Sequence, residues 1–379
     1  MDFAFSEEQD ALVELAEQIF RGQVDADRVA EIEASDDRID RELWAELAKA
    51  NLLGVAIPED HGGLGFDIVE LLLVLREQGR RVAPVPLWPT LVAAALPIGH
   101  FGSADLQGRL LPGVVSGQTV LTGAFAEVGS NDGRHSSVEA TPVDGGGWTL
   151  TGTKVAVPAA GVADAVLVPA RTGDELTVFV VERDAAGLAT ALNDTTNHEL
   201  HGTLTFDGVT VGDDAVIGQV GHGLAVVGWT VQRIQLAVSA IVLGACEEAL
   251  RMAAEYTSQR EQFGRPLSTN QGVALRAADC YIAIEGIRVT LLQAAWRLAT
   301  GLPAASQTEV AKWWSAEVGQ QCVHHVQHLH GGMGADIDYP VHRYFLWVKQ
   351  LENTFGGGSQ QLARLGTRIA QQAKAAAGA

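Results

Sequence analysis

The chain has 379 residues, of which 47% are hydrophobic, so it can bury a sizeable core and is expected to form two or three domains. Its formal net charge of −20 argues against nucleic acid and anionic membranes as partners, because both repel an acidic protein. No apolar run has the length of a membrane span, and the acidic first eight residues differ from a signal peptide. We therefore expect no membrane association and a cytoplasmic location.

The first 117 residues predict a helical domain. Ser6 is followed by Glu7, Glu8 and Gln9, which is typical of an N-cap with an acidic first turn, and apolar residues continue at helical spacing. Further helices are predicted over residues 41–50, 68–78 and 106–115. A Pro/Gly-rich turn at residues 52–65 separates two of them.

Residues 118–218 show a different pattern. Short segments rich in β-branched residues alternate with clusters of Gly, Pro and Asp. The predicted strands are residues 121–125, 137–140, 148–157, 165–168, 175–181 and 202–209. This spacing predicts a compact antiparallel β domain.

From residue 219 the chain returns to long helices, predicted over residues 231–256 and 270–298. Gly264 and Pro266 are typical helix breakers, so residues 258–267 predict a tight loop between them. The loop carries Arg260 and Phe263, which suit a phosphate-bearing ligand. A guanidinium can bind two phosphate oxygens at once, and an aromatic side chain can cover a flat ring of the ligand. A solvated turn between helices is the alternative interpretation.

The three cysteines, Cys246, Cys280 and Cys322, are widely spaced, and each lies inside a helical pattern. Their spacing matches no metal-binding or redox motif. Since unpaired cysteines are among the most buried residues, we predict three buried structural thiols.

The run Gln259–Leu267, followed by Gln271, resembles the arginine–x–x–phenylalanine–glycine loop of the acyl-CoA dehydrogenase family, and the resemblance extends along nearly the whole chain. It implies an α+β fold with an N-terminal α-helical domain (1–117), a middle antiparallel β domain (118–218) and a C-terminal four-helix bundle (219–379). It also implies FAD, an acyl-CoA substrate, and an electron-transfer flavoprotein or similar acceptor. Because this loop grips the FAD of a neighbouring subunit in the family, an oligomer is expected.

The resemblance assigns contacts to the dinucleotide part of FAD. The implied residues are Arg260, Gln262, Phe263, Gln271, His328, Gly331, Gly332, Gly334 and Gln360. The glycines allow close backbone approach and expose N–H donors to an anion. Two positions depart from the family, since Asn270 replaces a phenylalanine and His328 stands where a glutamine is usual. A helix C-cap is the alternative interpretation of the glycine turn.

The positions that face the flavin ring differ from the family. The motif around Glu127 begins with Ala126 instead of threonine, and the run Ala156-Val157-Pro158 lacks the usual tryptophan and ends without a hydroxyl. Gly358 likewise replaces a threonine that contacts flavin.

The chemistry implied by the family is α,β-desaturation of an acyl-CoA, in which a carboxylate removes the Cα proton while FAD accepts a hydride from Cβ. The family carries its base at one of two positions. In this chain the first is Gly356, and the second is Ile234, which lies 26 residues before Arg260. Neither can take a proton, so we predict no catalytic residue. The nearby carboxylates Glu247, Glu248 and Glu352 are interpreted as exposed on helix faces.

The family residues that are replaced in this chain are thus those that contact the flavin of the same subunit. The residues that contact the FAD of the neighbouring subunit are kept. The pattern favours a subunit of a hetero-oligomeric (α2β2) acyl-CoA dehydrogenase, resembling actinobacterial steroid side-chain enzymes, whose homologous partner carries the base. Two alternatives stay open: an active homotetramer using an unusual base such as Glu247, or a catalytically silent scaffold. Small residues in the C-terminal helices fit a roomy cavity for a bulky acyl group and equally fit close helix packing.

Overall fold

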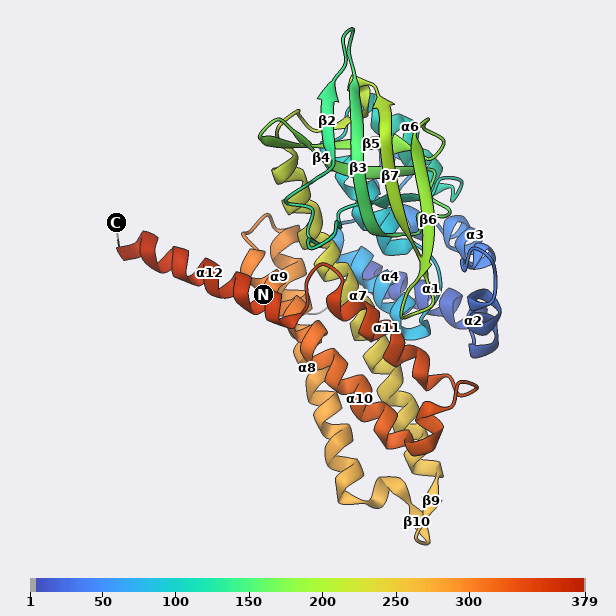
Figure 1. Ribbon diagram of the computed structural model, residues 1–379. Coiled ribbons are helices and arrows are strands. Elements are labelled where there is room, and N and C mark those ends of the chain that lie inside the picture. Colours follow the sequence, from blue (N-terminus) through green and yellow to red (C-terminus); the bar gives the residue numbers. More distant parts are fainter. Residues whose placement is uncertain (1–4, 378–379) are drawn as a thin grey trace. The chain divides into compact units, whose positions relative to one another are not determined.

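The computed structural model describes residues 5–377 and shows two compact units (Figure 1). One unit contains residues up to 26, residues 72–83 and residues from 235 on, and the other contains residues 27–71 and 84–234. We call them the bundle unit and the sheet unit. Two helices, α4 (Ile68–Arg81) and α7 (Gly223–Gln259), run from one unit into the other.

The sheet unit opens with a series of helices. They are α2 (Ala26–Glu33), α3 (Arg41–Lys49), η1 (Leu52–Gly54), η2 (Glu59–His61), η3 (Trp88–Ala95), α5 (Leu96–Phe101) and α6 (Ala104–Val115). Of these, α3 and α6 match the helices predicted over residues 41–50 and 106–115. Asp40 caps α3 by accepting a hydrogen bond from the Leu43 amide (3.0 Å), and Arg28 holds the same carboxylate (2.8 Å). The apolar stretch η3 is a fully buried π-helix.

The sheet itself has the strand order β6-β7-β3-β2-β4-β5-β8, with β1 paired to β4. The strands are β1 (Leu121–Gly123), β2 (Glu139–Pro142), β3 (Trp148–Pro158), β4 (Ala165–Thr172), β5 (Glu175–Glu182), β6 (Leu188–Asp194), β7 (Leu200–Val211) and β8 (Val216–Ile217). Most neighbours are antiparallel, whereas β4 runs parallel to both β1 and β2. Alternating inward side chains such as Leu150, Phe179 and Phe206 fill its core.

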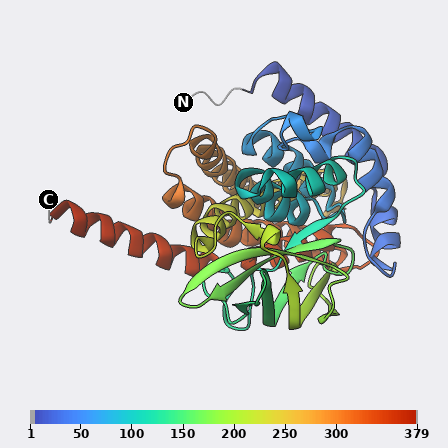
Figure 2. The same ribbon diagram turned by 90° about the horizontal axis from the view of Figure 1, so that it is seen from above.

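The bundle unit combines α1 with the C-terminal helices. They are α1 (Glu7–Gln23), α8 (Gln271–Ala299), α9 (Ala305–Trp313), η6 (Trp314–Val318), α10 (Gly319–His330), η7 (Gly331–Ala335), α11 (Val341–Asn353) and α12 (Gly358–Ala377). The capping box predicted at Ser6 is present, since Ser6 and Gln9 exchange hydrogen bonds between side chain and backbone. Figures 1 and 2 both show α12 extending outward from its first turns. Residues 1–4 of the acidic N-terminus lie outside the described residues.

Helix α7 is long and apolar enough to cross a membrane by composition alone. However, 78% of its most apolar window is buried within the protein, as in the core helix of a globular protein. Glycines at its contacts allow backbones to touch: a Cβ on Gly244 would lie 1.9 Å from the Arg76 carbonyl oxygen, and one on Gly79 2.0 Å from that of Ile241. At these positions the small residues therefore serve close helix packing.

Cys246, Cys280 and Cys322 are free and buried, as predicted. They come from α7, α8 and α10, and the Cys280 thiol donates to the Cys322 carbonyl. Hydrogen bonding to Cys322, together with burial, raises the pKa of the Cys280 thiol. All three thiols are buried and pack as small apolar groups.

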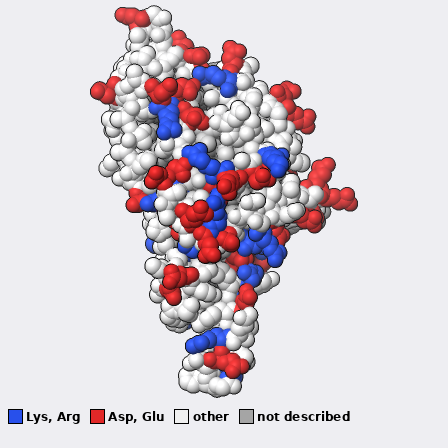
Figure 3. Space-filling model, turned by 90° about the vertical axis from the view of Figure 1, so that its right-hand side faces the viewer, with Lys and Arg blue, Asp and Glu red and all other residues white. Residues whose placement is uncertain are grey.

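Acidic side chains are spread over the surface. On the face shown in Figure 3, Lys and Arg side chains lie beside Asp and Glu instead of gathering into a patch. Exposed ion pairs such as Arg171–Glu139 (3.1 Å) and Arg109–Glu182 (3.1 Å) also bring opposite charges together at the protein surface.

Candidate functional site

The Arg260 loop is a β-hairpin at the far end of the α7–α8 pair (Figure 1). Strand β9 (Glu261–Gln262) pairs with β10 (Arg265–Pro266), and the turn residues Phe263 and Gly264 have φ of 56° and 75°. Two consecutive positive φ values are typical of a tight two-residue hairpin turn. The turn places Phe263 outermost, with 96% of its surface exposed.

The polar groups of this hairpin are available to a ligand. Among the described residues, the Arg260 guanidinium has no hydrogen-bond or ion-pair partner, and Gln262 and Gln271 are exposed. Arg265 differs, because its guanidinium donates to Asn270 Oδ1 (2.8 Å). The hairpin thus offers one unpaired guanidinium beside an exposed aromatic ring, which suits an anion attached to a flat group.

The glycine turn begins where α10 ends. Gly331 has φ 60° and ψ −131°, a conformation that favours glycine, and Gly334 fits against the Gln327 carbonyl, where a Cβ would approach to 2.4 Å. Gly332 has neither constraint, since a Cβ added there would meet nothing within 4 Å. The space over Gly332 is therefore open, as close backbone approach by a ligand requires.

The structure places His328 against the neighbouring helix. Its Nδ1 contacts the guanidinium of Arg276 on α8. His328 is exposed, and so are Gly331 and Gly332 beside it. This contact ties the end of α10 to the helix that follows the hairpin.

Three aromatic residues that we did not predict connect the hairpin to the glycine turn. His330 is only 2% exposed, stacks on Tyr256 (centroids 4.8 Å apart) and lies 5.3 Å from the ring of Tyr339. Its Nδ1 is within hydrogen-bonding distance of the Val326 carbonyl (2.8 Å). Tyr256 also accepts the Arg260 amide at its carbonyl (2.8 Å). The sequence did contain a signal for this cluster, because Tyr256 lies just before the Arg260 loop and His330 directly precedes the glycine turn.

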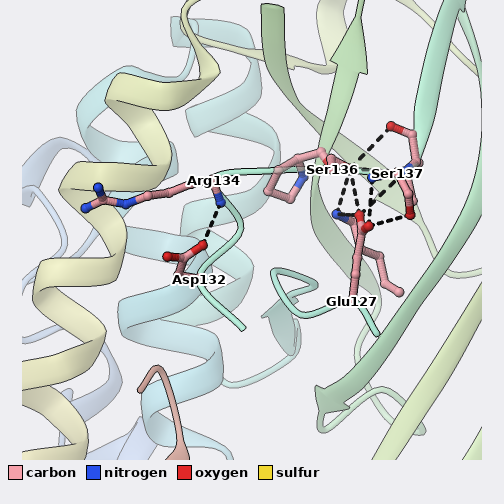
Figure 4. A network of polar contacts seen from close by, with 8 residues as sticks. Glu127, Asp132, Arg134, Ser136 and Ser137 are labelled. Carbon is pink, nitrogen blue, oxygen red and sulfur yellow. Dashed lines mark hydrogen bonds and ion pairs between the residues drawn. The ribbon is translucent and has the colours of Figure 1, made fainter. Parts of the chain in front are cut away.

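In the sheet unit, Glu127 is the centre of a polar network (Figure 4). It accepts hydrogen bonds from Lys154 Nζ (2.6 Å), Ser136 Oγ (2.7 Å) and the Ser137 amide (2.7 Å). Burial by itself would raise the pKa of Glu127, but these bonds lower it to about 2. Burial lowers the pKa of Lys154, whose side chain is fully enclosed. The network fixes the loop that leads from Glu127 to Ser137.

The end of β3 carries no side-chain hydroxyl. Ala156 has φ 50° at an irregularity in the β3–β7 register, and Pro158 accepts the Thr122 hydroxyl at its carbonyl (2.7 Å). Trp148 lies at the other end of this strand, where its Nε1 donates to Asp213 (3.1 Å). It is therefore held away from the run Ala156–Pro158.

The loop containing Gly356 is closed by amide groups. Gly356 has φ 107°, and a Cβ there would lie 2.5 Å from Gln361 Nε2. The buried Gln361 donates to the carbonyls of Phe355 (3.2 Å) and Gly356 (3.1 Å), and Gln235 donates to Phe355 as well (3.0 Å). Gln360 is exposed on the first turn of α12, and Ile234, the other base position, is fully buried.

The interpretation of Glu247 and Glu248 as exposed is wrong. Helix α4 and helix α8 bring three guanidiniums to Glu247: those of Arg76 (2.9 Å), Arg80 (2.7 Å) and Arg288 (2.7 Å). Only 8% of its side chain is exposed. Glu248 is buried and pairs with Arg251 (2.8 Å), whereas Glu352 is half-buried beside Lys349 (2.8 Å). For Glu247, two of the three arginines, Arg76 and Arg80, come from a distant segment of the sequence, which local patterns do not reveal.

Helices, a β domain and then helices along the chain, with this hairpin and glycine turn, are the architecture of FAD-dependent oxidoreductases that act on acyl-CoA. The sequence matches the acyl-CoA dehydrogenase N-terminal domain over residues 6–118 and the acyl-CoA dehydrogenase C-terminal domain over residues 221–372. The chain belongs to the acyl-CoA dehydrogenase family, whose cofactor is FAD.

Several relatives cover almost the whole chain. Acyl-CoA dehydrogenase FadE27 of Mycobacterium tuberculosis is 39% identical over 98% of this chain and 99% of its own length. Among solved structures, the ChsE4–ChsE5 complex from Mycobacterium tuberculosis is 39% identical, with a TM-score of 0.92 over 98% of this chain and 99% of that chain. A variant of the Tcur3481–Tcur3483 steroid ACAD is 46% identical, with a TM-score of 0.91 over 97% and 99%.

Proposed function

We propose that this chain is the base-lacking subunit of a hetero-oligomeric acyl-CoA dehydrogenase and completes the FAD site of a homologous partner subunit. One observation carries the proposal: the Arg260 guanidinium is unpaired among the described residues, whereas the Gly356 loop is closed by Gln235 and Gln361. In this family FAD supplies the hydride acceptor, so the proton at Cα must go to a carboxylate. That carboxylate would come from the partner.

The residues present fit one part of FAD better than the other. The unpaired Arg260, the exposed Phe263 and the open Gly332 suit the pyrophosphate and adenine. Toward the flavin ring, Pro158 and Gly358 bring no hydroxyl. This chain would therefore contact the pyrophosphate and adenine of an FAD whose flavin ring is enclosed by the partner subunit.

Two names among the relatives support the partner and the substrate class. ChsE4–ChsE5 is named as a complex of two different proteins, and Tcur3481–Tcur3483 as a steroid ACAD. By this similarity the substrate would be an acyl-CoA with a bulky steroid-like acyl group. Electrons would pass to an electron-transfer flavoprotein or similar acceptor, and the enzyme would act in the cytoplasm.

An active homotetramer with Glu247 as its base is a weaker candidate. Both carboxylate oxygens of Glu247 lie beside guanidiniums, at 2.7–2.9 Å. Three ion pairs of this kind hold the carboxylate in one place against the arginines of α4 and α8. A proton acceptor must instead reach the substrate within hydrogen-bonding distance.

The flavin-to-chain ratio tests the proposal. We expect little flavin in the isolated chain and about one FAD per two chains after co-expression with the homologous partner, because each site needs both subunits. Stoichiometric FAD and acyl-CoA oxidation by the isolated chain would overturn the proposal.

Two variants of the hairpin refine this measurement. Arg260→Ala should lower the flavin content of the assembled complex, since it removes the unpaired cation. Arg265→Ala is the matched control, because that guanidinium is already held by Asn270. Equal flavin content in the wild type and Arg260→Ala would favour the silent scaffold instead.

A further inference from the structure

Strand β6 forms an unprotected edge of the sheet. Among the described strands it pairs only with β7, and it lies at one border of the sheet in Figure 1. Six of its seven residues are exposed, and Leu192 remains 45% exposed. Edge strands are usually blunted by lysine, proline or a bulge. The described β6 has none of these, and its only charged residue, Asp194, is paired with Arg38.

A cavity of about 170 Å³ adjoins this edge, within the same unit. Leu192 of β6 lines it together with Leu200 and Val162, so the side chain of the edge strand forms part of its wall. Leu192 also lies against Gly161, where a Cβ would meet its Cδ1 at 3.0 Å. The strand edge and the cavity are therefore one continuous surface.

The cavity wall is stiff. Four of the chain's 12 prolines line it, namely Pro84, Pro86, Pro89 and Pro158. Proline fixes φ and presents no N–H, so this part of the wall is both rigid and apolar. Two further lining residues, Arg38 and Ala159, have φ of 54° and 53°, which non-glycine residues adopt only where the surroundings impose it. A preformed cavity lowers the entropy cost of binding.

The rim of the cavity is acidic. Asp36, Asp37 and Glu199 line it. Arg41 pairs with Asp37 (2.6 Å) and Asp194 pairs with the lining residue Arg38, so the negative charge that no arginine or lysine offsets belongs to Asp36 and Glu199. Asp36 is exposed and has no hydrogen-bond or ion-pair partner among the described residues. A ligand with positive charge beside an apolar group would complement this rim.

We propose that the β6 edge binds an extended segment of another protein, with an apolar side chain in the cavity and a lysine or arginine at the rim. In such β-strand addition, main-chain hydrogen bonds supply affinity and a pocket for one side chain supplies specificity. Every second residue of β6 directs its N–H and C=O away from β7, where an added strand can pair. The acidic rim selects a basic segment over an acidic one.

A labelled peptide tests the proposal on the assembled complex. The probe is a blocked peptide of about seven residues, Lys-Thr-Val-Leu-Val-Thr-Lys, whose binding is measured by fluorescence anisotropy. Two control peptides replace both lysines with glutamate or N-methylate alternate amides. We expect saturable binding of the lysine peptide, about tenfold weaker binding of the glutamate peptide, and loss of binding on N-methylation.

Leu192→Asp is the decisive variant, because it puts a charge into the cavity at a half-exposed position that tolerates it. Val143→Asp, 38% exposed at the β2–β3 turn of the same sheet, is the matched control. We expect about tenfold weaker peptide binding for Leu192→Asp and an unchanged affinity for Val143→Asp. Thermal melting checks that both variants fold.

Hydrogen exchange of residues 188–194 shows whether the peptide or another subunit of the complex pairs with the β6 edge. Protection that appears only when the peptide is added supports the proposal. Alternate β6 amides are protected by β7 in any case. A gain in β6 protection when the complex assembles, relative to the isolated chain and before any peptide is added, would mean that the edge is an interface between subunits, and would overturn the proposal. Absence of saturable binding, or equal binding to Leu192→Asp, would overturn it as well.

Discussion

The side-chain amide of Gln361 lies 2.5 Å from the point where a Cβ on Gly356 would stand. Gly356 also has a φ of 107°, in the region that favours glycine. Two independent constraints therefore disfavour a side chain at the place where the family carries its base. The absence of a carboxylate there is built into the backbone and into the packing around it.

Gly356→Ala should lower the free energy of unfolding by about 1–3 kcal/mol, because it combines a disfavoured φ with a steric conflict. Gly366→Ala on α12 is the matched control, since a Cβ there would meet nothing within 4 Å. That change should be neutral or stabilise by about 1 kcal/mol, as alanine favours helix. Chemical denaturation of both variants measures the difference, and equal stabilities would contradict the constraint at Gly356.

Lys154→Met should cost about 3–5 kcal/mol of stability at pH 7, because it leaves the buried Glu127 carboxylate without its cation. Since the pKa of Glu127 is lowered to about 2, its stabilising contribution is complete above the usual carboxyl pKa. It is lost as the pH falls toward 2. Unfolding measured at pH 7 and pH 4 should therefore show a weaker acid dependence in Lys154→Met. An unchanged acid dependence would count against the pair.

Lys312 donates to the last carbonyls of α11, Leu351 (2.9 Å) and Glu352 (2.9 Å), and burial lowers its pKa to about 7. The unfolded chain binds this proton up to about pH 10, so the free energy of unfolding rises as the pH increases from 7 toward 10. The same contribution is lost as the pH falls through 7. Lys312→Met removes this dependence. We would compare urea unfolding of both proteins at pH 7 and pH 9, and parallel profiles would refute the assignment.

Glu247→Gln should lower stability by about 1–3 kcal/mol, since it weakens a buried carboxylate's ion pairs with Arg76, Arg80 and Arg288. Turnover of the assembled complex per bound flavin should stay nearly unchanged. Loss of turnover in a variant that keeps its fold and flavin would instead identify Glu247 as a base.

Tyr256→Ala should loosen the hairpin, because it removes the ring on which His330 stacks. We expect faster hydrogen exchange over residues 260–267 and a lower flavin content in the complex. Tyr256→Phe keeps the stacked ring and should behave as the wild type. If Tyr256→Ala leaves the exchange rate unchanged, the stack does not position the hairpin.

The order of elements followed from local patterns, because turn residues and apolar periodicity act over a few positions. Strand β6 was not predicted, because both of its faces are exposed and its sequence shows no alternation of apolar and polar residues. Glu247 was misplaced because the arginine that pairs with it in α4, Arg76, is 171 residues away. The Tyr256–His330 stack likewise joins residues from separate helices.

The sequence by itself determined that the two positions where the family puts its base, Gly356 and Ile234, carry no proton-accepting side chain. It also determined the hairpin with Arg260, because turn preferences are local. Only the tertiary structure decided which groups are available. Arg260 lies unpaired among the described residues, whereas Gln235 reaches across 120 residues to the Phe355 carbonyl and closes the loop beside Gly356. Such contacts depend on how the helices pack against one another, so composition and motif spacing do not predict them.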